Sequence, residues 1–336
     1  MTYGGERVAL QKLRQKKPRF PRRGLRLRKK AKIKQNILIY DNGSIEEEKI
    51  CPERLMRLIY ENPLGGASLL WLVKRKAVSR LYGLYCQTKF SARGIPRFIK
   101  KYGVDMSGCT GTYKNFAQFF AREKSGISFP KISDELGVPC EGLVSVYDKI
   151  NPNELIAVKG SHFSLSDLFS DKALAENYRD GTMVSIRLTP ANYHRMHFFD
   201  DGFIKETRLL KGSLYSVSPL ALSKVVKLYC RNKRALIQID TKNFGSVVLV
   251  EVGATFVGSI VHCFKDGQHV TRGEVASYFK PGGSLVLCFF KKDKFEPDEA
   301  LVKRTAEGIE TKMAIGTLLG RKTDEVSQKK QSREDF

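Results

Sequence analysis

Two patterns of hydrophobic and polar residues divide the chain. From Cys51 to about Tyr102, apolar residues recur every three or four positions, which predicts amphipathic helices. After Val138, short apolar runs alternate with Gly, Asn, Asp and Pro, which predicts strands joined by turns. We therefore expect an α+β fold, in which a mainly antiparallel β domain follows a helical N-terminal part.

The same patterns give a coarse map. Strands are predicted over 143–147, 183–188, 236–239, 246–252, 257–264 and 285–290, and helices over 116–122, 165–178 and 219–230. A strand, the turn Asp41-Asn42-Gly43 and an acidic helix start are predicted over 37–50. The expected organisation is a basic, disordered arm over 1–36, a helical membrane-associating part over 37–130, a β-rich catalytic domain over 131–322 and a disordered tail over 323–336.

Apolar runs are too short to span a bilayer, since the best candidate, 64–73, has about half of the roughly 20 residues required. No apolar segment of the secretory type follows the N-terminal charges. The seven cysteines form no CxxC pair and no zinc-ligand spacing, which favours a reducing compartment.

The net charge of +24 is concentrated at the N-terminus, where residues 1–34 hold 14 Lys or Arg and one acid, Glu6. Such an arm is a solvated tail, a ligand for an anionic lipid surface, an organelle-targeting segment or, with no accompanying motif, a nucleic-acid binder. The helices that follow carry Lys74, Arg75, Lys76 and Arg80 beside apolar faces and Trp71, so they either lie in a membrane interface or pack on the body of the protein.

Candidate chemistry begins at residues 278–284, which read Tyr-Phe-Lys-Pro-Gly-Gly-Ser and run into an apolar strand. Gly-Gly-Ser before a strand is ordinarily a turn. The carbonyl of Gly283 has no side chain shielding it, however, and the hydroxyl of Ser284 could add to it and convert the peptide into an ester. Elimination would then cut the chain and leave dehydroalanine at position 284, which hydrolysis would convert into a pyruvoyl ketone with loss of ammonia.

Such a reaction needs a base, and a histidine polarised by a carboxylate is the usual one. Two of the five histidines, His194 and His197, stand three residues apart in one motif. A pair without a third ligand is seldom a metal site, and the sequence has no P-loop or dinucleotide fingerprint. We expect neither a metal nor an external cofactor.

Three blocks in this order resemble the pyruvoyl-dependent phosphatidylserine decarboxylases: Pro-Cys-Glu-Gly at 139–142, Pro-Ala-Asn-Tyr-His-Arg-Met-His at 190–197, and the 278–284 block. The resemblance, which runs from about Ile39 to about Gly320, implies a proenzyme that cuts itself between Gly283 and Ser284 into a β chain (1–283) and an α chain (284–336). The pyruvoyl cofactor would form a Schiff base with phosphatidylserine and release CO₂ and phosphatidylethanolamine.

The resemblance also implies roles for single residues. His197 would be the base acting on Ser284, Glu141 the carboxylate of that triad, and His194 a participant in decarboxylation. The chain departs from the family at five positions: Glu141 and Asn192 stand where Asp is usual, Ser277 replaces Gly, Pro281 replaces an aromatic or small residue, and Leu285 replaces Thr or Ser.

The expected partners are phosphatidylserine, an anionic membrane surface and the two chains of the cut proenzyme, with further dimerisation left open and no nucleic acid. A peripheral location on the cytoplasmic face of a bacterial-type cell membrane is expected, with an organelle membrane as the alternative. Two other functions stay open: a processing-deficient lipid-binding homologue, which the five departures would explain, and a decarboxylase of another serine-headed lipid or of a free amino acid.

Overall fold

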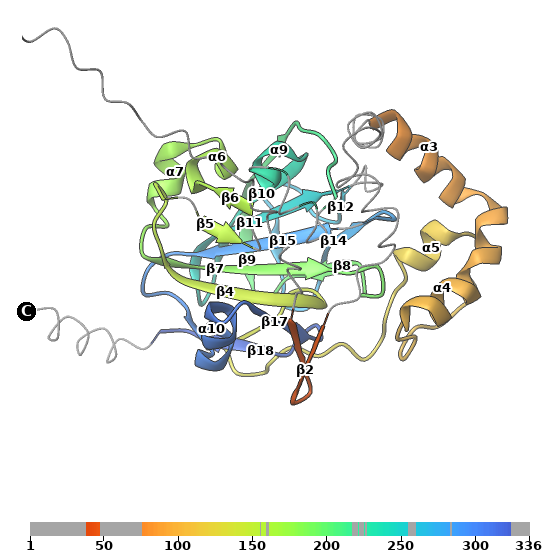
Figure 1. Cartoon of the computed structure of the whole chain (residues 1–336). Helices are drawn as coiled ribbons and strands as arrows, with labels where there is room; N and C mark the ends of the chain where they lie inside the picture. The colour runs from red at the N-terminus through yellow and green to blue at the C-terminus, as the bar shows by residue number, and fades with distance from the viewer. Residues whose placement is uncertain are drawn as a thin grey trace, which may run out of the picture. The chain divides into compact units, whose positions relative to one another are not determined.

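A ten-stranded sheet forms the centre of the molecule, in the strand order β13-β9-β10-β11-β15-β7-β4-β17-β1-β2 (Figure 1). The computed structural model describes residues 38–47, 76–154, 156–158, 161–216, 221, 225, 227–254, 260–282 and 284–323. Neighbouring strands are antiparallel except β1 and β17. The strands are β1 (Leu38–Asp41), β2 (Ser44–Glu47), β4 (Gly142–Ile150), β7 (Gly181–Leu188), β9 (Gly202–Leu210), β10 (Arg234–Thr241), β11 (Gly245–Gly253), β13 (His269–Val270), β15 (Ser284–Phe290) and β17 (Ile309–Met313).

Both faces of this sheet are covered, because alternate residues of its central strands enter two separate cores. On β15, Leu285, Leu287 and Phe289 pack with residues of α6 (Leu165–Phe169), α7 (Lys172–Glu176) and α9 (Leu228–Arg231). Val286, Cys288 and Phe290 belong to the other core. Helix α10 (Glu299–Ala306) packs beside β4 and β17.

That second core lies under a small sheet of order β12-β14-β8, formed by β12 (Ile260–His262), β14 (Val275–Phe279) and β8 (Arg195–His197). Two further small sheets complete the β structure. They contain β16 (Glu296–Pro297), β18 (Leu318–Arg321) and β3 (Glu135–Gly137), and β5 (Ile156–Val158) with β6 (Ser161–Phe163).

A helical part with its own apolar core lies between β2 and β3 in the chain and at the right in Figure 1. It contains α3 (Lys76–Gln87), the 3-10 helix η1 (Lys89–Gly94), α4 (Ile95–Tyr102) and α5 (Phe116–Phe120). Pro96 in the first turn of α4 and Gly103 at its end, with φ +61°, mark where that helix begins and stops. Within the described residues, no helix is both long and apolar enough to cross a bilayer.

The expected α+β fold with a mostly antiparallel sheet is confirmed, and each predicted strand coincides with an observed one where the structure describes it. The helix predicted over 165–178 is two helices, since Ser170 adopts a left-handed conformation (φ +53°) and Asp171 caps a new helix. Helix α10 and strand β9 were not predicted, and the acidic residues after the turn at 41–43, predicted to begin a helix, form strand β2 instead. The predictions for the N-terminal arm, for 51–75 and for the last residues lie outside the described residues.

Candidate active site

Ser284 is the first residue of β15, where it pairs with Gly253 on β11 and Leu188 on β7. It is fully buried, and its hydroxyl has no hydrogen-bond partner among the described residues. Gly282 has a φ of +145°, which residues with a Cβ rarely adopt. Gly283 lies outside the described residues, so the predicted scissile bond is seen from its serine side only.

His194 lies just before β8 and is completely buried. Its Nδ1–H donates to the carbonyl of Asn192 at 2.8 Å, because a carbonyl oxygen can only accept. The second nitrogen, Nε2, therefore carries a lone pair, and it has no partner among the described residues. The Phe120 ring lies 3.9 Å away between centroids. Burial lowers the pKa of His194 to about 3, with a smaller lowering by the charge of Arg122, so this imidazole is neutral at ordinary pH.

His197 is held from two sides. Its Nδ1–H donates to the carbonyl of Gly273 at 2.8 Å, and its Nε2 accepts from the hydroxyl of Tyr193 at 3.1 Å. Burial lowers the pKa of this histidine as well, and it raises the pKa of the Tyr193 phenol to about 12. Both partners are therefore uncharged, and His197 is a neutral base whose lone pair lies on Nε2.

Glu141 is linked to His194 through Asn192. The Nδ2–H of Asn192 donates to Glu141 Oε1 at 2.8 Å, and Asn192 Oδ1 accepts from the backbone N–H and the hydroxyl of Thr189, each at 2.7 Å. The carbonyl of Asn192 is the acceptor for His194. In this structure the carboxylate and the asparagine that depart from the family pattern thus bond to each other, and the hydrogen bonds of His197 go to Gly273 and Tyr193.

Strand pairing places His194 beside the end of β14 from which the chain leads to Ser284, whereas His197, next to Met196 on β8, faces the opposite side, and no described contact joins either histidine to Ser284. The N–H of Phe279 donates to the carbonyl of His194 at 3.0 Å, which extends the β8–β14 pairing to that histidine. Phe279 is the last residue of β14, and Ser284 follows it after a short loop. Met196, Phe279 and Val286 all belong to the core between the two sheets. Because side chains alternate along a strand, Ser284 faces the same core as Val286, and His194 faces the same side as Met196.

A second carboxylate, that of Glu251, faces this core, and it was not predicted from the sequence. Glu251 on β11 is fully buried; its carboxylate accepts from the hydroxyl of Ser277 and, at 2.7 Å, from His262 Nε2–H. It stands two residues from Gly253, the partner of Ser284, so its Cβ is about 7–8 Å from that of the serine. A single acid in the apolar run 246–252 was the available signal. The described residues contain no group of three or more His, Cys, Asp or Glu arranged to hold a metal.

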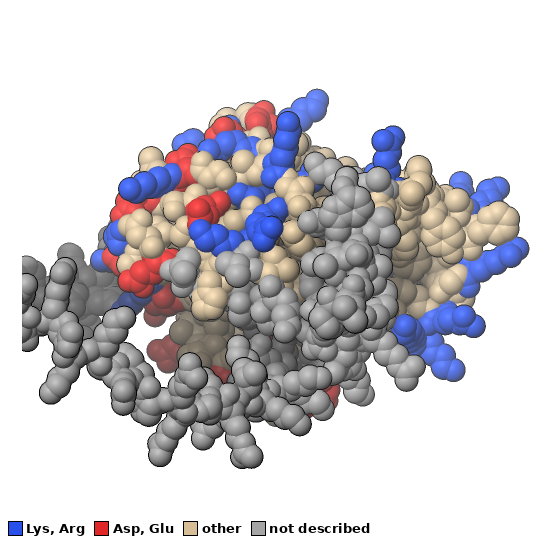
Figure 2. Space-filling model, turned by 45° about the horizontal axis from the view of Figure 1, so that its top comes forward, with Lys and Arg blue, Asp and Glu red and all other residues tan. Residues whose placement is uncertain are grey.

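A cavity of about 1080 Å³ opens between the helical part and the loop that leads to Ser284. Its lining contains five cationic residues, Arg80, Arg122, Arg195, Lys233 and Lys280, and one acid, Glu123. Figure 2 shows Lys and Arg side chains projecting around the helical end of the molecule, at the right. The cavity is therefore suited to an anionic ligand.

Comparisons with known proteins show the family to which the chain belongs. The sequence model of the family described as phosphatidylserine decarboxylase matches residues 114–321. A phosphatidylserine decarboxylase proenzyme of Ruminiclostridium cellulolyticum is 40% identical over 278 residues, 81% of this chain and 93% of the relative. Proenzymes of the same description from Clostridium novyi (40% over 280 residues, 82% and 95%) and Clostridium botulinum (37% over 282 residues, 82% and 95%) are similar. A match of this length, which includes both histidines and Ser284, establishes that the chain belongs to the phosphatidylserine decarboxylase family.

Proposed function

We propose that this protein is a carboxy-lyase that converts phosphatidylserine into phosphatidylethanolamine and CO₂, with a pyruvoyl group made from Ser284. The observation that carries the proposal is the buried hydroxyl of Ser284, which has no partner among the described residues, in a chain that matches decarboxylase proenzymes over four fifths of its length. A buried hydroxyl without a partner costs about 1–3 kcal/mol of stability, so its retention is evidence of a chemical role.

The surroundings of Ser284 fit a pyruvoyl group. Conversion of the serine to a ketone would sacrifice no side-chain hydrogen bond to a described residue. When formed, such a group supplies a ketone that condenses with the substrate amine and accepts the electrons released as the carboxyl group leaves. Residue 284 would hold it covalently, and no separate cofactor would be bound.

For maturation, we propose His197 as the base that takes the proton from Ser284, because its Nε2 lone pair belongs to a neutral imidazole at ordinary pH. The neighbouring His194 is proposed to act on the substrate, since its Nε2 is unpaired among the described residues and faces the core shared with Ser284. Glu141 is proposed as the carboxylate of the site. To complete the Glu141–His197–Ser284 triad it would have to exchange its bond to Asn192 for one to His197.

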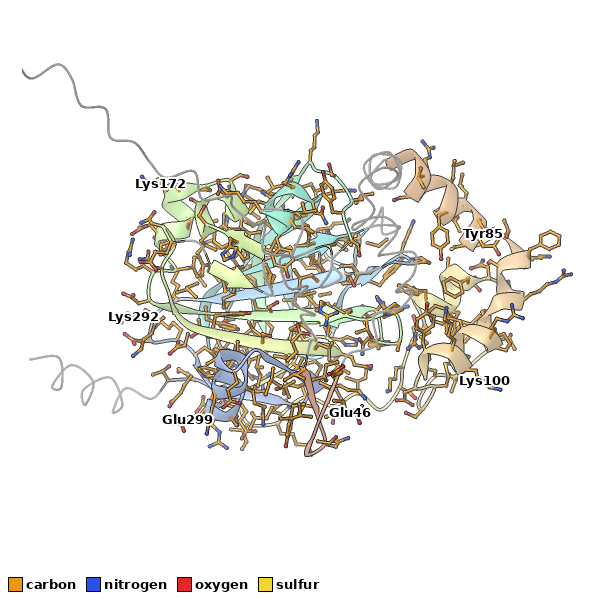
Figure 3. The ribbon with its side chains drawn as sticks, viewed as in Figure 1. Glu46, Tyr85, Lys100, Lys172, Lys292 and Glu299 are labelled. Atoms are coloured by element: carbon orange, nitrogen blue, oxygen red, sulfur yellow. The ribbon has the colours of Figure 1, made fainter. Side chains whose placement is uncertain are left out.

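We further propose that the cavity receives the substrate from a membrane surface, with the cut α and β chains remaining associated. Leu81, Leu84 and Tyr85 form an exposed apolar stripe along α3 at helical spacing, and Phe90 on η1 is 68% exposed. Figure 3 labels Tyr85 and, on α4, Lys100, both on the helical part. Apolar side chains among basic ones suit an anionic lipid interface. The proposed location is therefore peripheral, at the cytoplasmic face of the cell membrane.

A lipid assay tests the enzymatic proposal. Purified protein would be mixed with vesicles that contain phosphatidylserine, and phosphatidylethanolamine and CO₂ would be measured over time beside a Ser284→Ala control. Product from the wild type alone is the expected result. Equal, negligible product from both proteins would contradict the proposal and favour a processing-deficient lipid-binding homologue.

A further inference from the structure

We propose that the backbone carbonyl of Gly273 orients His197 in this chain, and that Arg272 is the positioning residue that fixes this carbonyl. The inference deepens the proposed function, because it rests on His197 as the base of self-cleavage. It gives a loop between β13 and β14 a part in orienting the base, a task for which a triad normally uses its carboxylate.

The hydrogen bonds of His197 determine its tautomer. A carbonyl oxygen has no proton to give, so the 2.8 Å contact between Nδ1 and Gly273 requires the proton on Nδ1. Neutral imidazole then presents a lone pair on Nε2, the atom that must accept a proton from the serine. If the Gly273 carbonyl moved away, Nδ1 would lose its acceptor and the tautomer would no longer be fixed.

The loop is shaped to present that carbonyl. Gly273 has a φ of +85°, a conformation that glycine adopts without strain. Its N–H donates to the carbonyl of Phe198 at 2.7 Å, and the N–H of Phe198 donates to the carbonyl of Glu274 at 2.9 Å. The residue after His197 is thus bonded to both sides of the loop, which holds the imidazole and its acceptor in register.

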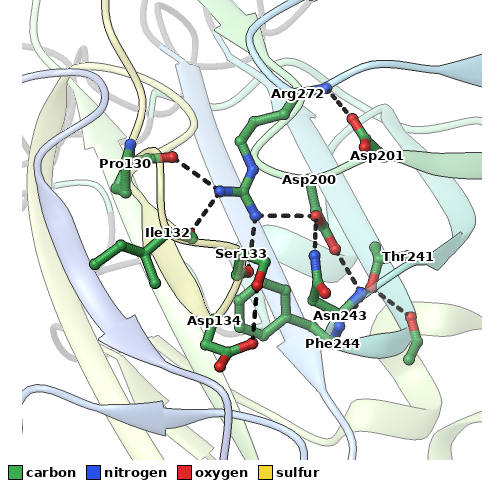
Figure 4. Close-up of polar contacts among 11 residues, drawn as sticks. Pro130, Ile132, Ser133, Asp134, Asp200, Asp201, Thr241, Asn243, Phe244 and Arg272 are labelled. Carbon is green, nitrogen blue, oxygen red and sulfur yellow. Dashed lines mark hydrogen bonds and ion pairs between the residues drawn. The ribbon is translucent and has the colours of Figure 1, made fainter.

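The side chain of Arg272 anchors the loop to two other segments (Figure 4). Its guanidinium donates to the carbonyls of Pro130, Ile132 and Ser133 at 2.9 to 3.0 Å and to Asp200 Oδ1 at 3.0 Å. The backbone N–H of Arg272 also donates to Asp201 Oδ1 at 3.0 Å. Four acceptors on one planar guanidinium fix the position of the backbone that follows it.

Asp200, the charged acceptor in this set, is itself held in place. Its side chain is only 1% exposed, and the backbone N–H and Nδ2–H of Asn243 donate to its two carboxylate oxygens, each at 2.8 Å. The aspartate follows β8 after two phenylalanines, so the anchor joins the histidine strand to the loop that carries its acceptor. Glu141 lies outside this network in the part of the chain that the structure describes, where it accepts a hydrogen bond from Asn192.

The tautomer can be measured without activity. Full-length protein carrying Ser284→Ala, labelled with ¹⁵N in the histidine rings, would be studied by NMR, with His197→Gln identifying the signal. We expect His197 to be protonated at Nδ1, and Arg272→Ala to convert it to a mixture or to the Nε2–H form. Arg321→Ala, which removes an exposed arginine paired with Glu135, is the matched control and should change nothing. An Nδ1–H signal that survives Arg272→Ala would overturn the inference.

Self-cleavage supplies the second readout, as the rate at which full-length chain disappears. Arg272→Ala should slow it at least tenfold, and guanidinium ion in the buffer should restore part of the rate. Arg272→Lys, which keeps the charge but cannot reach four acceptors, should be intermediate and serves if the alanine variant fails to fold. Severe loss in Glu141→Gln with normal cleavage in Arg272→Lys would assign the orienting role to Glu141. Normal cleavage by His197→Gln would instead refute the proposed base.

Discussion

Removal of His262 should expose how strongly the buried carboxylate of Glu251 depends on it. Glu251 is 0% exposed, and among the described residues its carboxylate bonds to the His262 ring and the Ser277 hydroxyl. Loss of one partner of a buried pair costs about 3–5 kcal/mol, because the remaining charge stays desolvated. His262 keeps 17% of its side chain exposed, so water can enter the space left by alanine. We therefore expect His262→Ala to lower the free energy of unfolding by about 3 kcal/mol, the lower end of that range.

A double-mutant cycle separates this effect from ordinary loss of packing. Glu251→Gln in the His262→Ala background removes the stranded charge and should recover about 2 kcal/mol of the loss. Urea unfolding would be followed in the Ser284→Ala background, where every molecule is one intact chain. His269→Ala, which removes an exposed histidine on β13, is the control. A coupling energy below about 0.5 kcal/mol would refute the reasoning, since independent sites show no more than that.

Three further predictions concern pH and the membrane. The pKa of His194 is about 3 in the folded state, below its value in the unfolded chain. Between these two pKa values the unfolded chain binds more protons than the folded one. The free energy of unfolding should therefore fall as the pH drops through this window, by up to about 1.4 kcal/mol per pH unit. Melting temperatures of the wild type and His194→Gln from pH 4 to 7 check this, and parallel curves would contradict it. Deletion of residues 1–34 should weaken binding to anionic vesicles most at low salt, as measured by sedimentation, and unchanged binding would exclude the arm as a lipid ligand. Leu84→Ser should weaken vesicle binding at every salt concentration, whereas a loss confined to low salt would argue against apolar insertion.

The parts of the fold that sequence could predict are those set by local pattern. The apolar run after Ser284 is a strand because it is buried on both faces, and the turn Asp41-Asn42-Gly43 forms the β1–β2 hairpin with Asn42 and Gly43 at positive φ. The β1–β17 pairing joins residues about 270 positions apart, and no local signal specifies it.

In the candidate site, too, only the features set by local pattern could be predicted from the sequence. Ser284, His194 and His197 could be selected because their motifs are local and chemically distinctive. Their partners could not, since Gly273 acts through a backbone carbonyl, which every residue possesses. The contact between Asn192 and Glu141 likewise depends on how two distant loops meet. A triad predicted from sequence alone therefore identifies the residues of the site more reliably than it identifies the hydrogen bonds between them.

The most direct test of the central claim is the intact mass of the purified full-length protein under denaturing conditions, beside Ser284→Ala. Cleavage before Ser284 would release residues 284–336, a fragment of 53 residues and about 6 kDa in a chain of 38.0 kDa. The account predicts this fragment, with the mass of a pyruvoyl N-terminus, in the wild type and a whole chain in the variant. Two uncut chains of full mass would contradict the claim that Ser284 is converted into the reactive group.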